Sequence, residues 1–429
     1  MKTTPAKRSP WAWIPTLYFA EGIPYVAVMT ISVIMYKRLG ISNTDIALYT
    51  GWLYLPWVIK PLWSPFVDII STKRRWVIAM QLAIGTAFAL IALALPGDMA
   101  FRLTLAVFWL VAFSSATHDI AADGYYMLAL NEHEQSFYVG IRSTFYRIAS
   151  VAAQGLLVVV AGFIETTTGN IPLAWAIVFG ILSLLFVAFA LYHAWALPNV
   201  ENKCADRSVR GKNTSSFGKE FGQVFTSFFR KKNVISALLF MLLYRLPEAQ
   251  LVKLINPFLL DPVGVGGLGL STADVGLVYG TVGIIGLTLG GIVGGIVAAA
   301  KGLRYWLRPM AWSMSLTCLT FVYLSYASDP SLLTINICVF IEQFGYGFGF
   351  TAYMLYLIYY SEGEFSTAHY SLCTGFMALG MMLPGMAAGW IQEQLGYRHF
   401  FIWTMVCCVA TIAVTYLLKI NPQFGIKRK

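Results

Sequence analysis

Charged residues are scarce in this sequence: only 12% of its 429 residues are Asp, Glu, Lys or Arg, while 58% are hydrophobic. A soluble domain of this length does not have a core large enough to bury so much apolar material. The sequence also lacks long polar segments, apart from one near its middle. These shortages exclude a soluble globular protein and predict an all-α integral membrane protein.

The sequence has few features that suggest chemistry. Its six cysteines form no CxxC pair and have no spacing to His that suits a metal. Five of them lie in apolar runs, where we expect small buried side chains, and Cys204 lies in the polar segment, where we expect a reduced thiol. No HExxH motif, no Ser or Cys nucleophile with a paired base and no phosphate-binding glycine loop stands in the sequence. We therefore expect no metal, no cofactor and no enzymatic activity.

Twelve apolar stretches are each long enough to cross a bilayer as a helix. We predict helices over residues 11–37, 44–68, 75–95, 99–128, 136–164, 173–197, 233–260, 272–299, 308–327, 332–361, 368–393 and 398–419. The charged N-terminus resembles the start of a signal peptide, but the apolar run after it is too long and has no small-residue cleavage site. We therefore expect the first helix to be retained.

The formal net charge of +10 is distributed unevenly along the predicted helices. With the N-terminus inside, 21 of the 30 Lys and Arg fall in cytoplasmic segments and five fall inside helices. The four on the opposite side are Lys37, Arg38, Arg102 and Arg398. This distribution predicts both termini in the cytoplasm and explains the positive charge by topology, so we expect no nucleic-acid partner.

The only long polar segment, residues 198–232, has six predicted helices before it and six after it. This layout is typical of a major facilitator transporter, whose substrate site lies between two six-helix bundles near the bilayer midplane. We predict the bundles at residues 1–197 and 233–429, joined by a basic cytoplasmic linker. Within the linker, residues 216–230 repeat Phe and Val among polar residues, which is typical of an amphipathic helix on the membrane surface.

The loop after the second helix resembles the facilitator signature of a small residue, an Asp and a basic cluster. Asp68 is followed by Arg74 and Arg75, and we expect Asp68 to pair with Arg74 or with a neighbouring helix end, as a conformational latch. The corresponding loop at residues 294–304 keeps the glycines and cations but has no Asp. That second loop also fits an ordinary positive-inside loop.

Ten charged residues lie well inside predicted helices, away from the helix ends, where a charge is costly and is seldom kept without a task. The cations are Lys60, Arg142, Arg147, Arg245 and Lys253, and the carboxylates are Glu21, Asp119, Asp123, Glu248 and Glu342. Depth along the helices predicts two cross-helix pairs, Asp123 with Arg142 and Asp119 with Arg147. Such pairs fit either a functional role or a static one that holds the bundle together.

The remaining internal charges are less clearly matched. Glu21 and Lys60 both lie near mid-membrane, and Arg245 and Glu248 share one face of the seventh helix at i and i+3. Glu342, in the tenth helix, has no obvious partner, so it is a candidate to carry a proton or contact a substrate.

The tenth helix also has a run of spaced glycines followed by tyrosines. Gly345, Gly347 and Gly349 predict close approach of a neighbouring helix, with a bend as the alternative. An aromatic stripe more often serves packing or the lipid interface, although sugar rings also stack on such faces.

Several segments resemble the AmpG family of bacterial muropeptide permeases, a branch related to the acetyl-CoA transporters. They lie in both halves: Leu17 to Ala20 with Gly22 and Pro24; Lys60 with Leu62 to Pro65 and Asp68; Ser115 and Ala116 with Asp119, Ile120 and Asp123; Tyr146 and Arg147; Leu243 to Arg245 with Glu248 and Ala249; and Phe340, Glu342, Gly347, Gly349 and Ala352. The sequence departs from the family at Glu21, Tyr126 and Leu128.

The resemblance implies a proton-coupled symporter of the bacterial inner membrane that works by alternating access. Its cargo would be N-acetylglucosaminyl-anhydromuramyl peptides, imported for cell-wall recycling. The helices that line the cavity in such facilitators are the first, fourth, seventh and tenth. A transporter of another anionic solute, acetyl-CoA-like or drug-like, remains the alternative.

On this basis we assign the candidate residues and partners. For proton coupling or gating they are Glu342, Asp119, Asp123, Glu21 and Glu248, and for substrate binding they are Lys60, Arg142, Arg147, Arg245, Gln343 and Tyr346. The expected partners are a small anionic sugar-peptide, protons and the lipid bilayer, and we expect the monomer to be the working unit.

Overall fold

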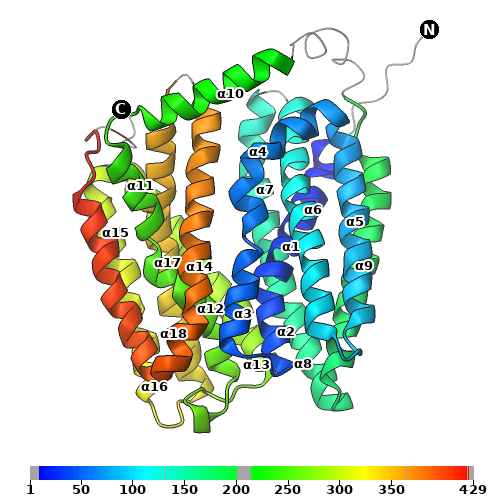
Figure 1. Cartoon of the computed structure of the whole chain (residues 1–429), viewed down its shortest axis with the longest axis vertical. Coiled ribbons are helices and arrows are strands. Elements are labelled where there is room, and N and C mark those ends of the chain that lie inside the picture. The colour runs from blue at the N-terminus through cyan, green and yellow to red at the C-terminus, as the bar shows by residue number, and fades with distance from the viewer. Residues whose placement is uncertain (1–8, 131, 201–213, 364, 423, 425–429) are drawn as a thin grey trace. The chain divides into compact units, whose positions relative to one another are not determined.

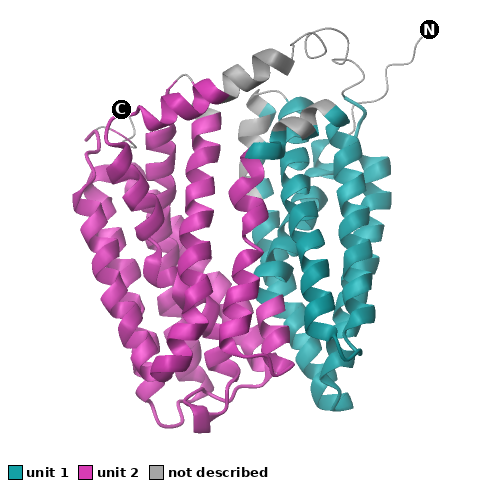
Figure 2. Ribbon diagram, viewed as in Figure 1, with its two compact units in different colours: residues 1–31, 62–217 teal, residues 32–61, 218–429 magenta. Residues whose placement is uncertain are grey.

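The computed structural model describes residues 9–130, 132–200, 214–363, 365–422 and 424. All regular elements among these residues are helices, and each of the twelve predicted stretches coincides with helix. The all-α prediction is therefore confirmed. The chain divides into two compact units, which we call unit 1, residues 1–31 and 62–217, and unit 2, residues 32–61 and 218–429 (Figure 2). The division into six-helix bundles at residues 1–197 and 233–429 stays a prediction.

The first two predicted spans are each divided between the units. The first span consists of a short 3₁₀ turn Pro10–Ala12, α1 Ile14–Val26, a π-helical turn Ala27–Ile31 and α2 Ser32–Arg38, and the second of α3 Asn43–Trp52 and α4 Leu55–Ile70. The unit boundary falls directly after the π-helical turn and again after Pro61 within α4. As a result, α2, α3 and the start of α4 pack as part of unit 2.

Unit 1 is a layered packing of long apolar helices. Its further elements are α5 Lys73–Ala94, α6 Ala100–Ala129, α7 Glu132–Val151, a π-helical turn Ala152–Leu156, α8 Leu157–Thr168 and α9 Ile171–Ala196. α5 packs against both α6 and α9, and α1 packs against α7 (Figure 1). The rings of Phe88, Phe179 and Phe186 fill the contact between α5 and α9, at centroid distances of 5.5–5.7 Å. Local caps fix the helix ends, since the Asn170 side chain accepts from Leu173 N at the start of α9.

Unit 2 contains the remaining helices. They are α10 Thr214–Phe229, of which the last turns belong here, α11 Val234–Leu243, α12 Leu246–Leu260, α13 Thr272–Leu277, α14 Ile284–Lys301, α15 Leu303–Thr317, α16 Leu319–Tyr326, α17 Leu332–Ser361 and α18 Ser366–Tyr416. A 3₁₀ turn Val263–Val265 follows α12, and a π-helical turn Val278–Gly283 joins α13 to α14. Gly396, at φ 71°, interrupts the helical conformation of α18 between the last two predicted spans.

The spaced glycines of the tenth predicted helix, now α17, serve close packing. A methyl group added at Gly347 would overlap the carbonyl oxygen of Leu287 on α14, and one added at Gly349 would meet Met314 on α15. Gly290 of α14 faces the carbonyl oxygen of Phe344 in the same way. The prediction of close helix approach at these glycines is confirmed, and the neighbouring Tyr353 is buried in packing.

The predicted amphipathic segment of the linker is helical, as α10. Its Phe228 is fully buried and stacks on Phe376, with ring centroids 6.0 Å apart, and it lies 5.7 Å from the ring of Tyr360. The apolar side of the described part of α10 therefore packs on unit 2 itself. Next in the chain, Lys231 Nζ donates to the carbonyl oxygens of Tyr360 and Glu362 at the end of α17, and burial lowers the pKa of Lys231.

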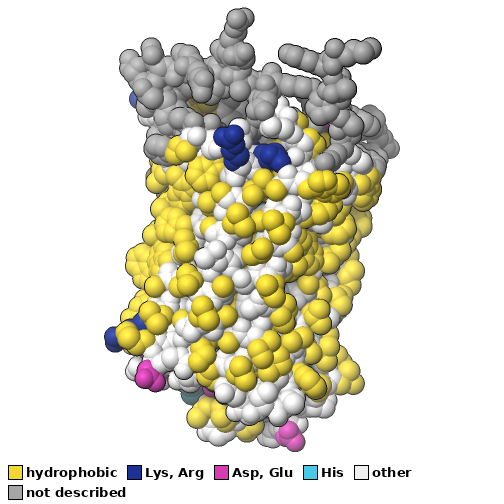
Figure 3. Space-filling view, turned by 90° about the vertical axis from the view of Figure 1, so that its right-hand side faces the viewer, with side chains coloured by type: hydrophobic (Ala, Val, Ile, Leu, Met, Phe, Trp, Pro, Cys, Tyr) yellow, Lys and Arg dark blue, Asp and Glu magenta, His cyan; other side chains and the backbone are white. Residues whose placement is uncertain are grey.

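Nine helical stretches among the described residues are long and apolar enough to cross a membrane, and the last of them, Ala368–Tyr416, covers two predicted spans. The spans at residues 44–68 and 308–327 are absent from this set, and each consists of two shorter helices. Large apolar side chains point outward, such as Leu93, Leu184 and Leu191 of unit 1. In Figure 3 the middle of one face is hydrophobic or uncharged, and charges lie only toward its two ends, as expected for a surface in lipid.

Candidate functional site

The predicted pair of Asp123 and Arg142 is present in unit 1. Arg142 Nη2 on α7 lies 3.0 Å from Asp123 Oδ1 on α6. The helical period places both side chains at the same depth on facing helices, which is why the sequence was sufficient to match them. The side chains are 30% and 39% exposed, so the pair lies within helices but solvent reaches it.

Two tyrosines hold this pair in place. The guanidinium of Arg142 lies 4.6 Å from the ring centroid of Tyr18 and 5.2 Å from that of Tyr126, and Tyr18 Oη donates to Asp123 Oδ1 at 3.2 Å. The two rings meet edge to face at 5.9 Å. Stacking on tyrosine faces leaves the planar fork of Arg142 fixed, and a fixed fork suits a carboxylate or phosphate.

The other candidates of unit 1 lie on the same helices as this pair. Asp119 is one turn from Asp123 on α6, Arg147 is on α7, and Glu21 is on α1, which packs against both α6 and α7. Glu21 is buried, whereas Asp119 and Arg147 are partly buried. The pairing of Asp119 with Arg147 stays a prediction.

Unit 1 also contains a buried polar network that the count of charges missed. Gln81 on α5 bridges two histidines: its Oε1 lies 3.0 Å from His193 Nδ1 on α9, and its Nε2 lies 3.0 Å from His118 Nε2 on α6. His193 Nε2 lies 3.0 Å from Thr16 Oγ1 on α1. With His193 protonated on Nδ1, each of these contacts is a hydrogen bond between neutral groups. The network ties four helices together directly beside Asp119.

In unit 2, the seventh predicted helix is broken where its charges begin. α11 ends at Leu243 and α12 starts at Leu246, and Arg245 between them has φ −104° and ψ 17°. Pro247 in the first turn of α12 explains the break, because proline has no backbone N–H to bond to the carbonyl oxygen of Leu243 and its ring would clash with that carbonyl in a continuous helix. The seventh predicted helix is therefore not continuous through Arg245, and the shared face of Arg245 and Glu248 stays a prediction. Discontinuous helices at mid-membrane are common at transporter binding sites.

Arg245 points to the aromatic face of α17. Its Nη2 donates to Tyr346 Oη, and its guanidinium lies 5.3 Å and 4.8 Å from the ring centroids of Tyr346 and Phe350. The side chain is only 8% exposed, and it makes no ion pair with a carboxylate among the described residues. The predicted substrate-binding residues Arg245 and Tyr346 are thus brought into contact.

Two carboxyl groups are buried in the same unit. Glu248 and Glu342 are each 1% exposed. Glu342 Oε2 accepts from Gln343 Nε2 at 2.8 Å, whereas Glu342 Oε1 and both oxygens of Glu248 have no hydrogen-bond partner within the described part of the chain. Because burying an unpaired charge is costly, gain or loss of a proton at these carboxyls changes the free energy of this unit strongly.

The predicted latch is only partly described. The Asp68 side chain lies outside the described residues. Arg74 Nε donates to Leu197 O at 2.9 Å, and Arg74 Nη2 donates to Ala194 O, so Arg74 caps the end of α9. Arg75 is exposed, and Lys60 is partly buried on α4 in the part that belongs to unit 2. Contacts of Asp68 with Arg74, and of Glu21 with Lys60, stay predictions.

Comparison with known proteins assigns the family. The family model of the Major Facilitator Superfamily matches residues 16–368. The chain belongs to the Major Facilitator Superfamily.

Individual relatives of this superfamily member cover nearly its whole length. It is 24% identical to the putative transporter AmpG 4 of Rickettsia conorii over 426 residues, which is 96% of each chain. It is 24% identical to the anhydromuropeptide permease of Escherichia coli over 405 residues, which covers 92% of this chain and 76% of that protein. The fold is similar to that of a bacterial homologue of the human lysosomal transporter Spinster, with a TM-score of 0.71, 15% identity and 96% coverage of each chain.

This facilitator is accordingly a membrane-embedded helical transporter with a small-molecule substrate. No group of three or more His, Cys, Asp or Glu that could hold a metal ion occurs within the described ranges. The five cysteines of the apolar runs are buried free thiols, as predicted.

Proposed function

We propose that this facilitator is a proton-coupled importer of anhydromuropeptides in the bacterial inner membrane. The observation that carries the substrate is the similarity to the anhydromuropeptide permease of Escherichia coli over 92% of the chain. The chemistry of the candidate residues supports it, because such a substrate has peptide carboxylates that an arginine fork can bind.

Arg142 is the best-placed substrate contact in unit 1. It is partly exposed, positively charged and oriented by Tyr18 and Tyr126, and its partner Asp123 is a carboxylate that a substrate carboxylate can replace. Arg245 has the corresponding role in unit 2, where its partner is the neutral Tyr346. Arg147, Lys60 and Gln343 remain further candidates for substrate binding, and Asp119, Asp123 and Glu21 remain candidates for proton coupling or gating.

Glu342 and Glu248 are the proposed proton carriers. Their buried oxygens without hydrogen-bond partners among the described residues support this role, since protonation removes the cost of a buried charge. A buried carboxyl that already has a neutral donor, such as Glu165 with Trp175 Nε1 at 2.9 Å, offers a matched control.

The test is uptake of labelled anhydromuropeptide into liposomes that contain the purified protein. We expect uptake to depend on an imposed proton gradient and to collapse with an ionophore. Glu342→Gln is expected to uncouple uptake from the gradient, whereas Glu165→Gln keeps the coupling. Uptake that is unaffected by both the ionophore and Glu342→Gln contradicts proton coupling. Lack of uptake, together with thermal stabilisation by acetyl-CoA or another anionic solute, would favour the alternative substrate class.

A further inference from the structure

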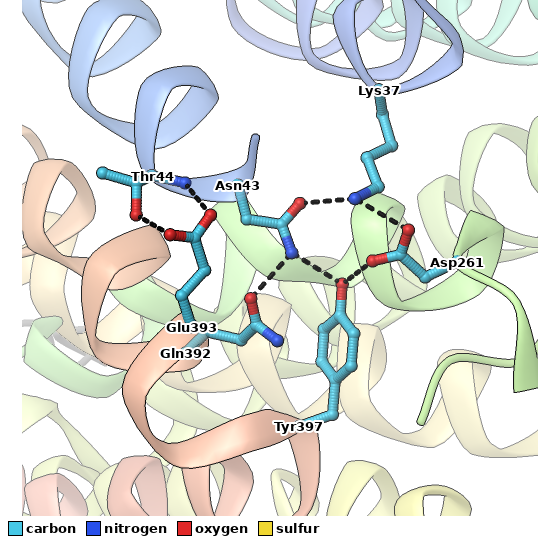
Figure 4. Close-up of polar contacts among 7 residues, drawn as sticks. All are labelled: Lys37, Asn43, Thr44, Asp261, Gln392, Glu393 and Tyr397. Atoms are coloured by element: carbon cyan, nitrogen blue, oxygen red, sulfur yellow. Dashed lines mark hydrogen bonds and ion pairs between the residues drawn. The ribbon is translucent and has the colours of Figure 1, made fainter. Parts of the chain in front are cut away.

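A ring of polar side chains joins the first two predicted spans to the second half of the chain. Lys37 lies at the end of the first span on α2, Asn43 starts the second span on α3, and both belong to unit 2. Lys37 Nζ lies 2.7 Å from Asp261 Oδ1 at the end of α12 and donates to Asn43 Oδ1 at 2.8 Å (Figure 4). Asn43 Nδ2 donates to Tyr397 Oη at 3.0 Å, and Tyr397 Oη donates to Asp261 Oδ2 at 2.6 Å. These four side chains form a closed cycle.

Two further contacts extend this ring along α18. Asn43 Nδ2 also donates to Gln392 Oε1 at 2.7 Å, and both the backbone nitrogen and the hydroxyl of Thr44 donate to the carboxylate of Glu393 (Figure 4). The backbones also lie close together, because a methyl group added at Gly389 would overlap the carbonyl oxygen of Asn43. The start of α3 therefore fits tightly onto α18.

A second contact lies deeper along α12. Lys253 is 3% exposed, and its Nζ donates to Thr50 Oγ1 on α3 at 2.9 Å. The Tyr54 ring centroid is 5.3 Å from the same Nζ, and Lys253 makes no ion pair with a carboxylate among the described residues. Lys253 and Asp261 are eight residues apart on α12, which is about 12 Å along a helix. The contacts of residues 32–61 with unit 2 thus form two layers at different depths.

Irregular helix lies directly before the segment 32–61 and again within it. A π-helical turn, Ala27–Ile31, ends directly before Ser32, and α3 and α4 are interrupted at Leu53 and Tyr54. Pro61 marks the boundary of unit 2 within α4. Such turns and breaks can absorb changes of backbone angle without disrupting the long helices on either side.

We propose that residues 32–61 form an outer gate, which is held shut by the ring of Lys37, Asn43, Asp261 and Tyr397 and by the deeper contact of Lys253 with Thr50. The proposal rests on the proposed transport function, because alternating access requires this segment to separate from α12 and α18 once in each cycle. The charge distribution places Lys37 and Arg398 on the side opposite to the cytoplasm, so the gate faces the periplasm. Both layers are broken when the gate opens.

The gate can be tested without any substrate, by labelling a reporter cysteine in intact cells. Ala47 is 1% exposed and lies one helical turn beyond Asn43 on the same face of α3. In a Cys204→Ser background the remaining native cysteines are buried, so an Ala47→Cys reporter can be followed with a membrane-impermeant maleimide. The same cells without the reporter give the background rate.

Without the charge at Asp261, we expect the gate to be open in a larger fraction of the molecules. We expect Asp261→Asn and Lys37→Met each to increase the labelling rate of the reporter about tenfold or more, as the loss of a charge-assisted hydrogen bond predicts. Asp274→Asn is the control, because Asp274 lies on the same predicted side and its carboxylate accepts a hydrogen bond from Ser271 at its own helix start. Labelling of Asp261→Asn and Lys37→Met at the rate of this control overturns the gate.

A second experiment locks the gate. Cysteines at Thr44 and Glu393 are expected to form a reducible cross-link that abolishes uptake, and reduction is expected to restore it. Full uptake with the pair completely cross-linked contradicts the gate. The two proposals fail separately. If Asp261→Asn and Lys37→Met are labelled faster but the protein takes up no anhydromuropeptide, the gate is retained and the proposed substrate is rejected. If the protein takes up anhydromuropeptide but labelling of these variants is unchanged, only the gate is rejected.

Discussion

Replacement of Arg142 distinguishes a substrate-binding role from a structural role of its pair with Asp123. The ion pair is 3.0 Å long, and its side chains are 30% and 39% exposed. An ion pair that solvent reaches contributes only about 0–1 kcal/mol to stability. Met retains much of the apolar stem that packs on Tyr18 and Tyr126. A purely structural pair therefore predicts a small decrease in stability for Arg142→Met and no change in KM.

A substrate-binding role predicts a much larger effect on transport. A hydrogen bond between charged groups contributes about 1.5–3 kcal/mol, which corresponds to an increase in KM of about 10- to 150-fold for Arg142→Met. Arg142→Lys keeps the charge but loses the fork and the stacking, so its KM should lie between those of Met and the parent. Asp123→Asn removes the carboxylate that competes with the substrate and keeps an acceptor for Tyr18, so its KM should fall.

The assay is the initial rate of anhydromuropeptide uptake into liposomes at several concentrations, with thermal unfolding measured on the same protein samples. The combination separates affinity from folding. An unchanged KM for Arg142→Met, together with a lower unfolding temperature for both Arg142→Met and Asp123→Asn, would refute substrate binding at Arg142 and leave a structural pair.

Three further predictions concern the packing of the two units. Gln81→Leu removes hydrogen bonds from the histidines on both sides and should reduce the free energy of unfolding by about 2–5 kcal/mol, because each buried unpaired group costs about 1–3 kcal/mol. An unchanged thermal unfolding temperature would contradict this network. Gly347→Val should prevent α14 and α17 from approaching and destabilise by about 1–3 kcal/mol or more, and a stable variant in the same measurement would show that this contact can relax. Tyr353→Phe removes only the hydrogen bond to Met241 O, 2.7 Å long, and should cost about 1 kcal/mol; a larger loss would mean that the ring itself moves.

The sequence predicted those features that depend on regular helix geometry. Spans follow from long apolar runs, and the pairing of Asp123 with Arg142 follows from counting residues along two helices of known rise. The close contact at Gly347 follows from the small size of glycine, which lets a second transmembrane helix approach. Each of these inferences needs only the position of a residue within one regular element.

The sequence was insufficient where helices depart from regularity. Residue counting assumed a continuous seventh helix, but the helix is broken at Arg245, next to Pro247, and counting did not predict that Arg245 donates to Tyr346 Oη. The proline, which lacks a backbone N–H, was a visible signal for this break. The π-helical turn Ala27–Ile31 has no comparable signal in one sequence, and it shifts the face that α2 presents.

Neutral polar residues form the contacts that a search for charges cannot find. A buried amide or imidazole without a partner costs about 2–7 kcal/mol in an apolar medium, so Gln81 and Asn43 need partners as surely as a charged residue does. Their partners come from helices far away in the sequence: Gln81 on α5 bonds to α6 and α9, and Asn43 on α3 bonds to Tyr397 on α18. Depth narrows the choice of partner, but only the arrangement of helices around each amide determines it. The sequence missed the contacts of Gln81 and Asn43 because at each of them three or more helices meet on one uncharged side chain.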